Sequence, residues 1–181
     1  GAPGWVDIVQ ANIRDRASIE RALEDADAVV NLVGVLTEKG KQTFESPQAE
    51  GAALLAEVAA EKGITRFVQV SAIGADAESN SNYARSKAEA EAAVRKAIPT
   101  ATILRPSVVF GPEDEFFNRF AQMARVAPLM PAIGGGKTKM QPVYAGDVAE
   151  AIAVAVDDES AVGKTYELGG PRVYTMNEIY D

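Results

Sequence analysis

The sequence contains no cysteine and no histidine among its 181 residues. These absences exclude a cysteine nucleophile, a disulfide, a zinc site built on histidine or cysteine, and a Ser-His-Asp triad. Any proton transfer by this chain must therefore use Asp, Glu, Lys, Tyr or Ser. No apolar run approaches the roughly 18 to 20 residues that a membrane-spanning helix needs, so we expect no transmembrane segment.

Positive charge is also scarce. The chain has 18 Lys and Arg against 26 Asp and Glu, which gives a net charge of −8. A surface of that sign repels phosphate backbones, so nucleic acid is not an expected partner. The apolar fraction of 47% and the charged fraction of 24% are near the averages of soluble globular domains. With the absence of cysteine, this composition predicts a soluble, cytoplasmic protein.

Apolar strand-like runs alternate with alanine-rich stretches of helical spacing, which predicts βαβ units and a doubly wound parallel sheet in an α/β fold. The expected strands are 6–9, 28–35, 66–71, 102–109 and 164–168. The expected helices are 18–23, 46–62, 83–97, 116–126 and 147–156. Ser18 and Asp147 are the expected N-caps of the first and last of these helices, and Thr175 with Glu178 forms a capping box. The strand 28–35 reads as buried on both faces because its apolar run is nearly continuous.

The most specific local signal is Tyr83-Ala-Arg-Ser-Lys87. Residues four apart share one helix face, so the ammonium of Lys87 can approach the phenol of Tyr83. The cation would lower the pKa of Tyr83 and let it exchange a proton with a substrate hydroxyl or carbonyl. The same spacing also fits a solvated surface pair. The position directly after the strand 66–71 favours a ligand site, because open α/β sheets bind ligands at the carboxyl ends of their strands.

Several short motifs follow one another in a fixed order: 11–15, 31–34, 70–72, Tyr83 with Lys87, 104–112, 142–149 and 166–170. Together they resemble the extended or atypical short-chain dehydrogenases/reductases, which are NAD-dependent epimerase/dehydratase-like proteins. The resemblance implies an NAD(P)-binding Rossmann-like fold. It makes residues 1–112 a partial dinucleotide-binding domain and residues 113–181 a partial substrate lobe. Segments 31–35 and 70–76 are most similar to the group around the nucleotide-binding accessory subunit of respiratory complex I.

The resemblance also implies the site residues. The catalytic set would be Tyr83, Lys87 and Ser71. The cofactor set would be Asn12 and Ile13 at adenine, Leu32, Val33 and Gly34 at the adenosine ribose, Tyr83 and Lys87 at the nicotinamide ribose, Pro106 and Val109 at the carboxamide edge, and Ser71. The implied cofactor is NAD or NADP, with NADP(H) favoured by the likeness to the complex I group. No metal site is expected.

Two features depart from the family pattern. No G-x-G-x-x-G or G-x-x-G-x-x-G occurs, although the family uses that loop to bind pyrophosphate at a helix N-terminus. We therefore expect the first two strands of the family fold to be absent, which would leave a gap between strands 6–9 and 28–35. Ala72 stands where the catalytic hydroxyl is expected. Ser71 could replace that hydroxyl only if the register is shifted by one, or if the strand has ended and the backbone turns at Ser71, because neighbouring strand residues point to opposite faces.

Three functions stay open at this point. The first is an NAD(P)(H)-binding, weakly catalytic or non-catalytic subunit, with a possible protein partner in a respiratory complex that would hold it at the periphery of an inner membrane. The second is an active oxidoreductase or sugar-nucleotide epimerase/dehydratase that acts on a small-molecule substrate through Tyr83 and Lys87. The third is a structural subunit without cofactor. Arg105 either pairs with an acid near the end of its strand or faces an anionic ligand group.

Overall fold

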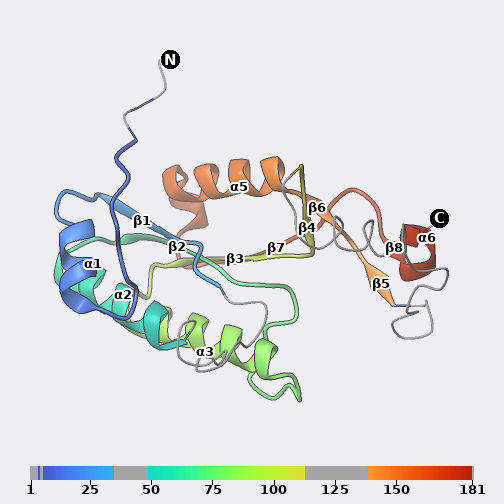
Figure 1. The fold of residues 1–181 in the computed structure, drawn as a ribbon, viewed down its shortest axis with the longest axis horizontal. Helices are drawn as coiled ribbons and strands as arrows, with labels where there is room; N and C mark the ends of the chain where they lie inside the picture. The colour runs from blue at the N-terminus through green and yellow to red at the C-terminus, as the bar shows by residue number, and fades with distance from the viewer. Residues whose placement is uncertain (1–3, 5, 35–48, 113–137, 181) are drawn as a thin grey trace.

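The computed structural model describes residues 4, 6–34, 49–112 and 138–180. A parallel four-stranded sheet lies between two layers of helices (Figure 1). Its strand order is β1 (Ala28–Asn31), β2 (Arg66–Val70), β3 (Thr102–Pro106) and β7 (Thr165–Leu168), and each neighbouring pair is parallel. The α/β class is confirmed. The expected helix 116–126 and the expected helix start at Ser46 and Pro47 lie outside the described residues.

One face of the sheet packs against α1 (Arg16–Ala22), α2 (Gly51–Glu61) and α3 (Asn82–Ala97), and the other face packs against α5 (Ala145–Asp157) (Figure 1). Neighbouring residues of β2 show the alternation that produces these two layers. Phe67 joins the cluster under α2 and α3, whereas Val68 joins Leu104 and Ala155 under α5. Each face of the sheet therefore has an apolar core of its own.

Shorter elements follow β3. The strand β4 (Val109–Phe110) pairs in parallel with β6 (Val143–Tyr144), and β5 (Lys139–Met140) pairs antiparallel with β8 (Tyr174–Thr175). The remaining elements are a 3-10 turn, η3 (Glu159–Ala161), and α6 (Met176–Tyr180). The strand expected over 102–109 is thus divided after Pro106. No helix in the described ranges has the length and apolarity to cross a bilayer.

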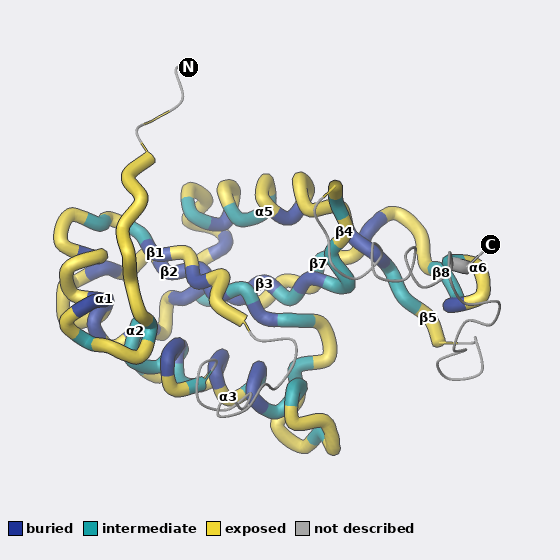
Figure 2. The backbone as a smooth tube through the Cα atoms, in the orientation of Figure 1, coloured by how far each residue is buried: buried dark blue, intermediate teal, exposed yellow. Residues whose placement is uncertain are grey.

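The N-terminal segment does not form the expected strand over 6–9. Val6 and Ile8 are 84% and 98% exposed, and the segment runs outside the sheet (Figure 2). The gap expected between strands 6–9 and 28–35 falls beyond β1, at the edge of the sheet, because β1, β2, β3 and β7 form one ladder on the other side of it. A strand needs a neighbour that accepts and donates its backbone hydrogen bonds, and no described strand lies beside residues 6–9.

The strand β1 is shorter and more exposed than its apolar run suggested. It ends at Asn31 rather than near residue 35, and Val30 is 37% exposed whereas Val29 is buried. β1 lies at the edge of the sheet, and the apolar cluster under α5 contains residues of β2, β3 and β7 but none of β1. Continuous hydrophobicity in the sequence was therefore a wrong indicator of burial on both faces.

Two helices begin earlier than expected. The N-cap of α1 is Asp15, which accepts from Ala17 N, and not Ser18 three residues later. α5 likewise begins after Tyr144, which places Asp147 in its first turn. The capping box of Thr175 and Glu178 is confirmed, with Thr175 N donating to Glu178 Oε2 over 2.8 Å and Glu178 N donating to Thr175 Oγ1 over 3.3 Å.

Candidate functional site

The helix α3 begins next to the carboxyl ends of the strands (Figure 1). Ser81 caps it by accepting a hydrogen bond from Ala84 N. This cap fixes the first turn, so Tyr83 and Lys87 lie on one helix face. The Nζ of Lys87 is 5.7 Å from the centroid of the Tyr83 ring, which is within the range of a cation–π contact. The predicted approach of these two side chains is confirmed.

Gly34 completes this cluster from the end of β1. A Cβ atom on Gly34 would lie 3.2 Å from Lys87 Nζ, so the ammonium of Lys87 lies directly against the backbone there. Lys87 makes no hydrogen bond or ion pair with any residue in the described part of the chain. Its three N–H donors therefore have no acceptor within that part of the chain.

A buried pair of amides holds the segment that leads to Gly34. Asn31 Nδ2 donates to Gln69 Oε1 over 2.8 Å, and Gln69 Nε2 donates to Val70 O over 3.0 Å. Asn31 Oδ1 accepts from Val33 N at 3.1 Å. Asn31 and Gln69 are each only 2% exposed. The pair therefore ties the turn after β1 to the neighbouring strand.

Ser71 lies directly after the end of β2. The strand stops at Val70, and Ser71 N donates to Leu104 O over 2.7 Å. Ser71 Oγ is buried and has no hydrogen-bond partner among the described residues. The strand assignment thus ends before Ser71, but Ser71 N and Ile73 N still donate to Leu104 O and Pro106 O of the neighbouring segment, so the turn that would let Ser71 replace a hydroxyl at Ala72 is not shown. An orphaned buried hydroxyl is unfavourable unless a ligand or water satisfies it.

Burial controls the protonation of Tyr83 and Lys87. Removal of water raises the pKa of Tyr83 and lowers the pKa of Lys87, with the nearby Glu91 carboxylate partly opposing the second change. The expected lowering of the Tyr83 pKa is therefore wrong in this structure. An ammonium over the ring face does not outweigh the cost of burying a phenolate. The neutral phenol is a hydrogen-bond donor at neutral pH.

Arg105 and Glu91 form a second charged cluster next to Lys87. Arg105 Nε donates to Glu91 Oε1 over 2.9 Å, and Arg105 Nη2 donates to Glu91 Oε2 over 2.7 Å. Arg105 Nη1 also lies 3.9 Å from Glu167 Oε1. Of the two interpretations of Arg105, the structure confirms pairing with an acid near the end of its strand.

The other candidate residues lie around this cluster or apart from it. Asn12 N donates to the Ser18 hydroxyl on α1, and Ile13 packs against Gly51 at the start of α2. Pro106 ends β3 and accepts from Ile73 N. Val109 lies in β4, which pairs with β6. The structure thus joins Gly34, Tyr83 and Lys87 by contact, whereas α1 and α2 hold Asn12 and Ile13.

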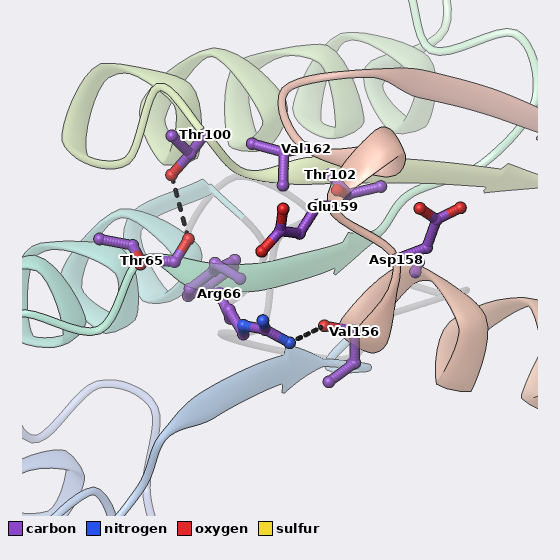
Figure 3. A pocket seen from close by; sticks show the side chains of 10 residues that line it. Thr65, Arg66, Thr100, Thr102, Val156, Asp158, Glu159 and Val162 are labelled. Carbon is purple, nitrogen blue, oxygen red and sulfur yellow. Dashed lines mark hydrogen bonds between the residues drawn. The ribbon is translucent and has the colours of Figure 1, made fainter.

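A cavity of about 450 Å³ lies at the opposite, amino end of the strands (Figure 3). Three of its polar side chains have protein partners: Arg66 donates to Val156 O, Thr102 donates to Ala161 O, and Asp158 accepts from Ser160. No group of three or more metal-ligating side chains occurs within the described stretches. The buried hydroxyl without a partner among the described residues, Ser71 Oγ, lies instead after the carboxyl end of β2.

Sequence reasoning missed Gln69 and Glu91. Both carried a usable signal, because each is a polar residue at a position whose neighbours are apolar. Gln69 interrupts the run of β2, and Glu91 lies between Ala90 and Val94 on the buried face of α3.

Residues 2–169 match the NAD dependent epimerase/dehydratase family. The chain belongs to this family. The chain is 45% identical over 181 residues to the mitochondrial NADH dehydrogenase (ubiquinone) 1 alpha subcomplex subunit 9 of Arabidopsis thaliana. The match covers 99% of this chain and 45% of that protein. The subunit of the same name from Mus musculus is 37% identical over 176 residues, covering 97% of this chain and 47% of that protein. The chain thus spans about half the length of these relatives.

Solved structures of other proteins are similar in fold to this chain. The dTDP-glucose 4,6-dehydratase DesIV from Streptomyces venezuelae, a double mutant solved with NAD bound, superposes with a TM-score of 0.81 at 23% sequence identity. The match covers 93% of this chain and 60% of that protein. At this identity, the likeness supports the Rossmann-like fold alone.

Proposed function

We propose that this chain is part of an NAD(P)(H)-binding subunit of a respiratory complex. Membership of an NAD dependent family and the names of the two relatives support the proposal. The observation that carries it is the cluster of Gly34, Tyr83 and Lys87, in which the buried ammonium makes no hydrogen bond with a described residue. The buried Ser71 hydroxyl, which has no partner among the described residues, follows the end of the neighbouring strand β2. The Lys87 ammonium can donate to the hydroxyls of a ribose, and the Ser71 hydroxyl can donate or accept.

The remaining contacts follow from the same proposal. Lys87 and Tyr83 would bind the nicotinamide ribose, Leu32 to Gly34 the adenosine ribose, and Asn12 with Ile13 the adenine. Pro106 and Val109 would border the carboxamide. The dinucleotide would supply hydride chemistry when bound. We further propose attachment to a membrane complex through a protein partner.

The test measures dinucleotide binding to the full-length protein that contains this chain. Thermal melting is recorded with and without saturating NADPH or NADH, and a ligand at 100 times its dissociation constant should add about 2.7 kcal/mol to the free energy of unfolding. Lys87→Met should weaken binding about tenfold or more, because a charge-assisted hydrogen bond to a ribose is lost. Lys96→Met changes an exposed lysine of the same helix and is the control. An unchanged melting temperature with both dinucleotides would refute the proposal.

An active oxidoreductase or epimerase is the second candidate. The buried, unpartnered hydroxyl of Ser71 favours it, since a carbonyl substrate would satisfy that group. The neutral Tyr83 phenol would donate a proton to the substrate carbonyl, and Lys87 would hold the Tyr83 side chain in place. Tyr83→Phe should then abolish turnover while the dissociation constant of the dinucleotide stays within about threefold. Absence of turnover by the unmodified protein on carbonyl and sugar-nucleotide substrates would count against this candidate.

A further inference from the structure

The spacing of Lys87 and Glu91 on α3 creates a competition for the ammonium of Lys87. The two residues are one helical turn apart and both are buried, at 6% and 7% exposure. Lysine and glutamate four residues apart on a helix normally attract each other. Nevertheless no ion pair joins them among the described residues.

Arg105 explains why the two side chains stay apart. Its Nε and Nη2 take one oxygen each of the Glu91 carboxylate, at 2.9 and 2.7 Å. A guanidinium matches a carboxylate in this two-point geometry, whereas an ammonium is a point charge that cannot. Glu167, at 3.9 Å, adds a second negative charge on the far side of Arg105.

We propose that Arg105 is a positioning residue, which holds the Glu91 carboxylate so that the Lys87 ammonium stays directed at Tyr83 and Gly34 instead of forming an ion pair. The inference rests on the proposed binding of a dinucleotide ribose by Lys87. Without Arg105, both oxygens of Glu91 lose their partners in a buried place. Lys87, one helical turn away and without an ion pair among the described residues, can then satisfy them, whereas Arg95, one turn in the other direction, is already bonded to Thr165.

Among the described residues, Tyr83 and Glu91 on α3 interact with Lys87, and Glu91 is joined in turn to Arg105 on β3, which lies near Glu167 on β7. The segment 32–34 contributes no charged or titratable group. Burial lowers the pKa of Lys87, and Glu91 acts in the opposite direction. Release of Glu91 toward Lys87 should therefore raise the pKa of that amine, which gives a signal that a purely structural ion pair would not produce.

The test uses the full-length protein with Arg105→Met, Arg105→Met/Glu91→Gln and Arg105→Lys. Two quantities are measured: the pKa of the Lys87 amine, from its rate of trace labelling against pH, and the dissociation constant of NADPH. Arg105→Met should raise that pKa and weaken NADPH binding about tenfold, because Lys87 is drawn into an ion pair. The double variant should restore both values, since no carboxylate remains. Arg95→Met breaks the hydrogen bond of a nearby arginine to Thr165 and should change neither.

Each outcome bears on the inference. An unchanged Lys87 pKa in Arg105→Met, or a double variant that titrates and binds like Arg105→Met, would overturn it. If Arg105→Met does not fold, Arg105→Lys is the deciding variant, because a lysine keeps the charge but satisfies only one oxygen of Glu91. In Arg105→Lys, a raised pKa of Lys87 supports the inference, and an unchanged pKa overturns it. If the pKa shifts as expected but the unmodified protein binds no dinucleotide, the proposed function fails while Arg105 keeps its role toward Lys87.

Discussion

The buried amide pair of Asn31 and Gln69 allows a sharp test of how the turn after β1 is held. Asn31→Leu removes the donor to Gln69 Oε1, which is 2.8 Å from Asn31 Nδ2 in a place where both side chains are 2% exposed. A buried acceptor left without a donor costs about 1–3 kcal/mol. The amide of Val33 also loses its acceptor, but Val33 is 43% exposed and water can replace that bond. We expect a loss of about 2 kcal/mol in the free energy of unfolding.

The double variant Asn31→Leu/Gln69→Leu replaces both partners by apolar groups of similar size. Its cost should be clearly smaller than the sum of the two single variants, with a coupling of about 1–2 kcal/mol, because no buried amide remains unsatisfied. The measurement is urea denaturation of the full-length protein, in which the midpoint shifts and the slope stays constant.

The same variant should affect the site. Asn31→Leu releases the turn that carries Gly34 toward Lys87, so NADPH affinity should fall together with stability. Asn177→Leu, an exposed asparagine on α6, should change stability by no more than about 0.5 kcal/mol. Additive single effects, within about 0.5 kcal/mol, would refute the reasoning.

Two further predictions concern α3. Ser81→Ala removes the N-cap that accepts from Ala84 N and should lower the free energy of unfolding by about 1 kcal/mol. The amides of the first turn of α3 should then exchange hydrogen faster. Unchanged exchange of these amides, relative to the amides of the last turn, would contradict the role of the cap. Lys87→Met tests the pH dependence of stability. Because burial lowers the pKa of Lys87, the unfolded chain binds more protons than the native one between the lowered native pKa and the usual lysine pKa, so the unmodified protein loses stability as pH falls through that interval. Lys87→Met lacks this contribution, and its stability relative to the unmodified protein should increase as pH falls through the same interval. A difference that is constant with pH, in urea denaturation at several pH values, would contradict this sign.

Local patterns predicted much of the fold and part of the site. The helix 83–97 agrees with α3 to within one residue, because its limits follow from a cap and a helical face that lie within a few residues of each other. The strand at 66–71 and the capping box of Thr175 and Glu178 are also features of short segments. The approach of Lys87 to Tyr83 belongs to this group, since four residues of helix fix it.

Other properties depended on residues that are far apart in the sequence. Val6 to Val9 has the composition of a strand, yet no strand in the described part of the chain pairs with it. The pKa of Tyr83 rises because several elements bury the ring together, whereas spacing alone reveals only the cation. Arg105 meets Glu91 across 14 positions and two different elements. Composition, periodicity and caps act over a few residues, so the sequence by itself determines them. Burial, strand pairing and the partner of a charged side chain are decided only by the tertiary structure, because they arise when distant segments pack together and exclude water.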